Sequence, residues 1–375
     1  MAAIEDTQPY LDFVRYCISE QQCIPTIMDW HALFLFMQEQ ALLGVGFRGI
    51  ERMKEAGVDI PRNLLLKWYA ISEQIRQRNV EMNKRCVELT EMLKKDGFES
   101  CILKGQGNAV LYSNPYTRQP GDIDVWVSPI SRKGKDKKDV INYVKRKYEK
   151  VDVEYHHVEV MTEGEIDVEF HYMPGYIQHP LYNRRLQKFF DDERERQMKH
   201  RVLLEDVGKE IVVPTWDFNV IQQLEHMKNH FINEGVGLRQ MMDYYYLLRK
   251  AKDDNRQRPT DNGELIATLK WLGLYKFAGA VMWVLHEVFG LEEKCYIVPV
   301  DERRGKTLLK AVLNGGNFGH HAEFYKRRQA SKNHIRRFMI YTTNSFNYFD
   351  EYPSDVIFSA IFRFVNYFRT MLNNK

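Results

Sequence analysis

The sequence lacks the cysteine pattern of a disulfide framework and the long apolar runs of membrane segments. Its 375 residues include five cysteines, an odd number with no CxxC spacing, so we expect reduced thiols and a cytoplasmic location. No apolar run approaches the roughly 18 residues that cross a bilayer. The first residues also lack the basic and apolar regions of a signal peptide. These absences predict a protein whose partners do not include a membrane.

The sequence also lacks an excess of either positive or negative charge. Lys and Arg number 54 against 51 Asp and Glu, which leaves a net charge of +3 and no overall field for binding polyanions. Internal repeats and low-complexity linkers are also absent. The composition that remains is globular, with 44% hydrophobic and 28% charged residues. The chain is long enough for two domains, or for one domain with a large appendage.

The spacing of apolar residues divides the chain into three predicted domains, 1–96, 97–214 and 215–375. Helices are expected over 10–18, 31–43, a long segment ending at Gly97, 106–112, 135–150, 182–200, 215–232, 237–252, 261–290, 302–315, 328–346 and 354–373. Strands are expected over 98–103, 123–127, 151–160, 166–172 and 210–213, with a hairpin loop at 161–165. The predicted fold class is α+β, with a small mixed β-sheet core, N-terminal helices and a C-terminal helical domain.

Two aspartates, Asp122 and Asp124, open an apolar strand. Because side chains alternate along a strand, both carboxylates project from the same side. Carboxylates held this close repel, and one becomes protonated unless a cation lies between them. Mg²⁺ is the cation that takes oxygen ligands from one or two carboxylates and from substrate phosphates. The pair alone also fits two solvated aspartates at a strand end.

A second strand carries more acids. In residues 166–171, alternation places Asp167, Glu169 and His171 on one face and the apolar residues on the other. If this strand lies beside the first, either Asp167 or Glu169 completes a three-carboxylate cluster that can hold two metal ions about 4 Å apart. The alternative is an outer strand whose polar face lies in water.

A turn between a strand and a helix precedes the aspartates. Its residues Lys104, Gly105 and Gln106 can bring backbone N–H groups and a point charge to a phosphate. The spacing is not that of a Walker A loop, and the turn taken alone is explained better by a tight strand-to-helix connection with no ligand. Arg118 fits two roles, which are neutralising a phosphate and pairing with a nearby carboxylate.

Other polar patterns have ordinary explanations. His226 and His230 have the i, i+4 spacing of metal ligands but no zincin motif, so we interpret them as core or hydrogen-bonded histidines. Arg239 and Asp243 have the spacing of a helical ion pair. Residues 132–150 are rich in Lys and Arg, which fits a solvated helix face better than a surface for an RNA backbone.

Together these motifs resemble the polymerase-β-like nucleotidyltransferase superfamily. The resemblance rests on the Leu-Lys-Gly turn at 103–105, on Arg118, on the Gly-Asp-Ile-Asp sequence at 121–124, and on an acid-x-His strand. The most similar branch is its uncharacterised bacterial nucleotidyltransferase family, and the resemblance extends over residues 70–250. One departure is Gly105-Gln106, where the superfamily usually has Gly-Ser.

The resemblance implies an enzyme that moves a nucleoside monophosphate from a nucleoside triphosphate, such as ATP, to an acceptor hydroxyl or phosphate. Asp122 and Asp124 would hold Mg²⁺ or Mn²⁺, and Glu169 would be the third carboxylate and the general base, with Asp167 as its rival. It implies, finally, that Lys104, Gly105 and Gln106 lie against the triphosphate.

The acceptor stays open between a protein, a small molecule and RNA. Two other hypotheses remain: a catalytically silent binding or scaffold module with this fold, and a toxin-like transferase that modifies tRNA. An Asp124→Asn variant is expected to abolish transfer and leave folding intact if the enzyme hypothesis is right.

Overall fold

The computed structural model describes residues 4–19, 23–131, 136–160, 166–253, 262–317 and 334–373. Four helices come first: α1 (Ile4–Ile18), α2 (Trp30–Glu39), α3 (Leu43–Glu55) and α4 (Arg62–Lys95). The Asp29 carboxylate caps α2 by accepting from the backbone N–H of His31 and Ala32. The predicted helix at 31–43 is wrong at its end. α2 stops at Glu39, because Ala41 has a positive φ of 55° that turns the chain before α3 begins.

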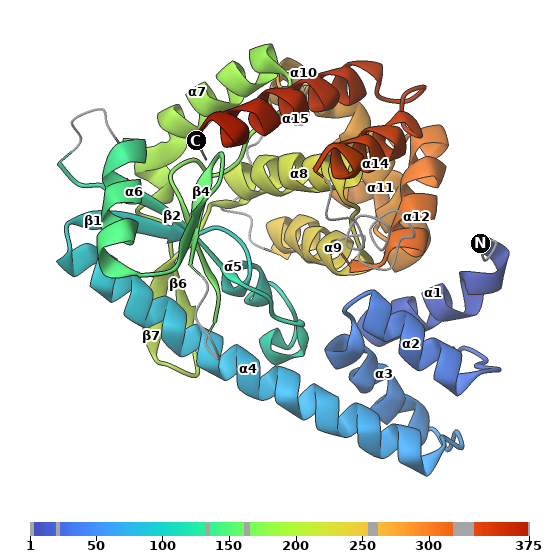
Figure 1. The fold of residues 1–375 in the computed structure, drawn as a ribbon. Coiled ribbons are helices and arrows are strands. Elements are labelled where there is room, and N and C mark those ends of the chain that lie inside the picture. Colours follow the sequence, from blue (N-terminus) through green and yellow to red (C-terminus); the bar gives the residue numbers. More distant parts are fainter. Residues whose placement is uncertain are drawn as a thin grey trace.

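The long helix α4 was predicted from its apolar stripe, and its buried residues confirm that stripe. Ile75, Met82, Cys86, Leu89 and Leu93 are all buried. The helix ends before Gly97, whose φ of +89° suits glycine. α4 packs along α3 and along two strands, β1 (Phe98–Ile102) and β7 (Lys209–Val212) (Figure 1).

The central sheet has five strands in the order β1-β2-β5-β4-β3. Strand β2 (Ile123–Pro129) pairs antiparallel with β1 and parallel with β5 (Val168–His171). Strand β4 (His157–Val160) pairs antiparallel with β5 and with β3 (Val151–Val153). The sheet is therefore mixed, and the predicted α+β class is confirmed.

The single strand expected over 151–160 is wrong. The chain turns back between β3 and β4, where the Glu154 N–H donates to the His157 carbonyl at 3.0 Å, so the alternating pattern belongs to two short strands. The hairpin loop expected at 161–165 lies outside the described residues. The strands that flank it, β4 and β5, do pair antiparallel.

Two faces of the sheet meet different surroundings. Val125, Val127 and Phe170 belong to a core that they share with the C-terminal half of α4 and with helix α6 (Asp136–Lys147). Trp126 belongs to a second core, which contains helix α8 (Trp216–Asn233), and its ring stacks on Phe218 of that helix at 5.8 Å. Because Asp124 and Trp126 are two residues apart on β2, the Asp124 side chain also faces α8.

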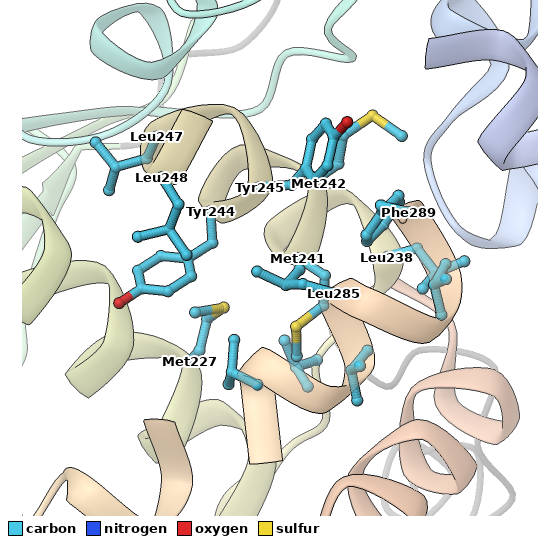
Figure 2. Packing of buried hydrophobic residues seen from close by; sticks show 14 of the residues in the cluster. Met227, Leu238, Met241, Met242, Tyr244, Tyr245, Leu247, Leu248, Leu285 and Phe289 are labelled. Atoms are coloured by element: carbon cyan, nitrogen blue, oxygen red, sulfur yellow. The ribbon is translucent and has the colours of Figure 1, made fainter. Parts of the chain in front are cut away.

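The remaining helices are α5 (Gln106–Ala109), α7 (Pro180–Gln197), α9 (Leu238–Asp253), α10 (Asn262–Trp271), α11 (Tyr275–Phe289), α12 (Glu302–Gly315), α14 (His334–Phe346) and α15 (Pro353–Asn373), with short 3₁₀ turns at Pro115–Thr117 and Glu293–Cys295. Figure 1 shows the helices from α8 onward gathered beside the sheet. Met241 and Tyr244 of α9 lie among side chains of α8 and α11, such as Met227 and Leu285 (Figure 2).

One predicted helix in this region is wrong and one strand was missed. Residues 261–290 were expected as a single helix, but α10 and α11 meet at a bend of 119°, where Gly273 has a φ of +69°. Strand β6 (Arg201–Leu204) pairs with β7 in a separate two-stranded sheet. Its sequence, Arg201 followed by three apolar residues, shows no alternation to detect, and Leu203 is exposed.

Among the described residues, no single helix is long and apolar enough to cross a bilayer. The bent pair α10–α11 is long and apolar enough only when its two helices are taken together.

Candidate active site

The acids predicted from two separate motifs lie opposite each other on neighbouring strands. In the parallel pairing of β2 and β5, Asp124 is the partner of Glu169. Glu169 and His171 alternate with the core residues Val168 and Phe170, so they share the α8-facing side with Asp124. Adjacent strands thus bring two carboxylates together that are 45 residues apart in the sequence.

A chain of contacts joins these acids to two bases. The Lys104 ammonium lies 2.7 Å from Asp124 Oδ1. His171 Nε2 lies 3.0 Å from Asp124 Oδ1 and 3.1 Å from Glu169 Oε2. Asp124 is 3% exposed and His171 is 1% exposed, so these charges have little water to solvate them and depend on one another.

Burial and neighbouring charges divide the protons among these groups. Burial first, and then Asp124 and Glu169, raise the pKa of Asp122 to about 6. Burial acts in the same direction on Asp124, but Lys104 and the His171 hydrogen bond outweigh it and hold the pKa of Asp124 well below its usual range. Burial is likewise outweighed at His171, where hydrogen bonds to Asp124 and Glu169 raise the pKa to about 9. At neutral pH the site therefore holds a protonated imidazole between two carboxylates.

The two rival third acids occupy different places. Glu169 lines a cleft of about 550 Å³ together with Asp122, Asp124 and Lys104. Asp167 precedes β5, is exposed, and accepts the Ile123 N–H through its backbone carbonyl at 3.0 Å. Asp167 is not one of the described residues that line the cleft.

The turn after β1 places its three residues unequally. Lys104 and Gly105 line the cleft, and Gly105 has a φ of +55°. The Gln106 side chain is buried against α4, where its amide nitrogen donates to Asn83 Oδ1. It therefore points away from the cleft, and only its backbone is near the turn that a phosphate would approach. The helix expected at 106–112 is the shorter α5.

Arg118 pairs with a carboxylate, which is the second of its two predicted roles, and it also lines the cleft. Its guanidinium forms two hydrogen bonds with Asp243, at 2.8 and 2.9 Å, and both residues are buried. Tyr112 donates to the same carboxylate at 2.7 Å. The helical spacing predicts an ion pair between Asp243 and Arg239. In the structure, Arg239 Nη1 donates to the Gln119 carbonyl. The Arg118–Asp243 pair thus ties the loop before β2 to α9.

The far wall of the cleft comes from α8. His226 Nε2 lies 2.8 Å from the Lys104 ammonium and 3.1 Å from His230 Nε2, so the two histidines are hydrogen-bonded, as predicted, and also line the cleft. Burial, followed by Lys104 and His230, holds the pKa of His226 well below its usual range. The neutral ring can accept a hydrogen bond from Lys104.

Several residues that line the cleft were missed from the sequence. They are His156, His157, Glu225, Phe362 and Arg363. The adjacent histidines carried a signal, because two imidazoles lay within one alternating segment. Glu225, Asn229 and Asn233 form a polar i, i+4 stripe on α8, a second signal that was not used.

The described part of the basic segment, residues 136–150, lies on the other side of the sheet. Val140 and Val144 bury α6 against the core opposite the carboxylates, and Lys145, Arg146 and Lys147 are exposed. Arg132, Lys133 and Lys135 lie outside the described residues. The solvated helix face that we predicted is therefore confirmed for the described part of the segment.

Glu225 gives a test of buried charge in this cleft. Its Oε1 accepts from the Tyr176 N–H and from Asn229, while Oε2 is buried with no partner among the described residues. Burial raises its pKa from 4.5 to about 8, so between these pH values the folded protein binds a proton that the unfolded chain releases. Stability therefore falls as pH rises through this window, by up to about 1.4 kcal/mol per unit.

Glu225→Gln removes the charge and keeps the shape. We expect the variant to match the wild type near pH 4 and to be more stable by on the order of 4 kcal/mol at pH 8. Urea unfolding midpoints measured at both pH values check this. Stability curves that stay parallel across the window would show that Glu225 is not protonated in the fold.

Comparisons with known proteins agree with this geometry. A family model described as uncharacterised nucleotidyltransferase matches residues 27–290, a segment that contains the whole sheet, α8 and α9. Searches of the curated proteins and of the solved structures find no match. Because the family model covers more than half of the chain and includes both acid-bearing strands, this protein belongs to the uncharacterised nucleotidyltransferase family.

Proposed function

We propose that this protein is a metal-dependent enzyme that moves a nucleoside monophosphate from a nucleoside triphosphate to an acceptor. The observation that supports this most strongly is the pairing of Asp124 with Glu169 at the wall of a cleft that Asp122 also lines. Membership of the polymerase-β-like superfamily, in its bacterial branch, is part of the same proposal.

The proposed cofactor is Mg²⁺ or Mn²⁺, and the donor set fits it. Hard divalent ions take carboxylate oxygens, and Asp124, Glu169 and His171 each offer a ligand atom within 4.8 Å of the others. Asp122, Asp124 and Glu169 would hold two ions. In the protein without metal, Lys104 and protonated His171 balance the charge of the carboxylates. Bound ions would stabilise the negative charge of the reacting phosphoryl group.

The side chains of the cleft would bind and orient the triphosphate and accept a proton from the acceptor hydroxyl. Lys104 and Gly105 would lie against the triphosphate, with the ammonium as a point charge for its oxygens. The acceptor hydroxyl oxygen forms a bond to the α-phosphorus, the bond from that phosphorus to the bridging oxygen breaks, and pyrophosphate leaves. Glu169 accepts the hydroxyl proton, since it is the carboxylate that lines the cleft beside Asp124.

The acceptor side of the cleft involves helices beyond the family match. Phe362 and Arg363 of α15 line the cleft but lie after residue 290, where the match ends. α15 is held on α8 by the Lys228–Asp355 ion pair at 2.6 Å. We infer that this added wall selects the acceptor. A protein or small-molecule acceptor is favoured over RNA, because the basic helix α6 packs on the opposite face of the sheet.

Phe362→Ala tests the role of this wall. The Phe362 ring packs on Tyr155 and Tyr176, with centroid distances of 5.0 and 5.3 Å. Aromatic contacts contribute about 0.5–1.5 kcal/mol, so we expect the KM for the acceptor to rise by up to roughly tenfold with kcat nearly unchanged. Ile361→Ala, at a position on the same helix that is 50% exposed, is the matched control. Equal KM values for both variants and the wild type would show that α15 does not select the acceptor.

The function is tested by supplying each α-labelled nucleoside triphosphate with Mg²⁺ or Mn²⁺ and a cell lysate. Label that enters a protein, a small molecule or tRNA identifies the donor and the acceptor together. Absence of transfer with every nucleotide and both metals would favour the catalytically silent scaffold instead.

A further inference from the structure

Three histidines meet beside the carboxylates. His157 opens β4 and is the register partner of His171 at the end of β5, while His156 lies in the turn before β4. The ring centroids of His156 and His157 are 4.5 Å apart, and each is 5.0 Å from that of His171. One ring nitrogen from each residue lies within 4.8 Å of those of the other two.

The contacts of these rings leave nitrogen atoms available. His157 Nδ1 lies 3.3 Å from His156 Nε2, so this hydrogen bond joins two imidazoles instead of an imidazole and a carboxylate. His171 Nε2 is directed at Asp124 and Glu169. Its Nδ1 is buried and has no hydrogen-bond partner among the described residues, although buried polar atoms are normally partnered.

This division of partners is the one that metal-ligating histidines show. Such a histidine binds the ion through one ring nitrogen and gives the other N–H to a carboxylate, which orients the ring. His171 already has the carboxylate partners on one nitrogen and no partner on the other, so a bound ion would replace the proton that Nδ1 carries in the metal-free protein. Glu169 adds an oxygen donor to the cluster, since its Oε2 lies 3.7 Å from His157 Nδ1.

The chemistry of the donors selects the ion. Mg²⁺ prefers oxygen ligands and retains water, whereas imidazole nitrogen suits Zn²⁺ and its first-row neighbours. We propose that His156, His157 and His171 form a binding position for a divalent transition ion of the Zn²⁺ type, next to the oxygen-donor position at Asp122 and Asp124. The cleft would then hold metal ions of two chemical kinds. This inference goes beyond nucleotidyl transfer and does not depend on it.

Cobalt titration of the full-length, metal-stripped protein tests the position directly. Co²⁺ replaces Zn²⁺ and absorbs visible light in a nitrogen-containing site, and added Zn²⁺ should abolish the absorption. We expect the His156→Ala, His157→Ala double variant to bind Co²⁺ at least tenfold more weakly. His226→Ala, which removes a cleft histidine outside the cluster, and Asp122→Asn, which removes a carboxylate, should both retain the absorption.

Two results would overturn the proposal. One is a wild-type protein that binds no Co²⁺ or Zn²⁺. The other is a double variant that binds Co²⁺ like the wild type while Asp122→Asn does not, which would place the ion on the carboxylates alone. Circular dichroism checks that the variants fold, and if the double variant does not fold, the single change His156→Gln at a partly buried position decides. None of these readouts uses a nucleotide, so failure here leaves the proposed transfer reaction untouched.

Discussion

Replacing Asp122 by asparagine is expected to stabilise the metal-free protein and to abolish nucleotidyl transfer. Asp122 lies close to Asp124 and Glu169, and burial together with their charges raises its pKa to about 6, against 3.8 in an unfolded chain. The folded protein thus binds the proton more tightly, and stability falls as pH rises from about 4 to 6. Above pH 6 the ionised carboxylate costs about 3 kcal/mol, and asparagine removes that cost.

The gain in stability should appear in EDTA above pH 6 and vanish near pH 4, as measured by urea unfolding. Transfer should fall by about 10³-fold or more, because the amide provides no charge for a metal ion that stabilises the transferred phosphoryl group. Asp167→Asn is the matched control, since Asp167 is exposed and outside the cleft, and it should retain activity. An active Asp122→Asn enzyme would contradict the proposed metal ligands.

Asp122 is a better test residue than Asp124. The sequence alone predicted that Asp124→Asn would leave folding intact. In the structure Asp124 is buried and compensates both Lys104 and His171. Its removal leaves the Lys104 ammonium without its carboxylate partner and His171 with Glu169 alone, which is destabilising. Loss of activity in that variant would not separate catalysis from folding.

The second large effect is expected at Asp243. Replacing it by asparagine leaves the buried Arg118 guanidinium uncompensated and should cost about 3–5 kcal/mol of stability. The same carboxylate also accepts from Tyr112 and from Asn108, so its loss disturbs the network under the Lys104 turn. The midpoint of urea unfolding at pH 7 measures this loss.

The matched control is Asp192→Asn, which removes an exposed pairing with Lys188 and should cost less than about 1 kcal/mol. The result also decides between the two roles of Arg118. If Asp243→Asn is as mild as the control, and an Arg118 variant raises the KM for the nucleotide without loss of stability, then Arg118 is a phosphate ligand and not a structural partner of Asp243.

Local patterns in the sequence predict the strand faces of the site well. Alternation placed Asp124 on the polar face of one strand and Glu169 and His171 on that of another, and both strands exist. The β2–β5 pairing was expected only as a condition, because alternation does not determine which strands are neighbours. The stripe of α4 was found for the same reason, since one buried face repeats at helical spacing.

The remaining features depend on contacts between distant parts of the chain. Lys104 reaches His226, 122 residues later, and Arg118 reaches Asp243, 125 residues later, and neither contact has a local pattern. The breaks at Ala41 and Gly273 depend on positive φ angles that the apolar spacing does not signal. The three domains predicted from the patterns stay a prediction.

The most direct test of the proposed reaction compares two positions of the label in the same nucleotide. The protein is incubated with Mg²⁺, a lysate and the donor nucleotide carrying ³²P at either the α- or the γ-phosphate. We predict that α-label enters the acceptor, that γ-label leaves as pyrophosphate, and that Asp122→Asn does neither. Transfer of the γ-label to the acceptor, or an active Asp122→Asn variant, would contradict nucleotidyl transfer at the Asp122–Asp124–Glu169 site.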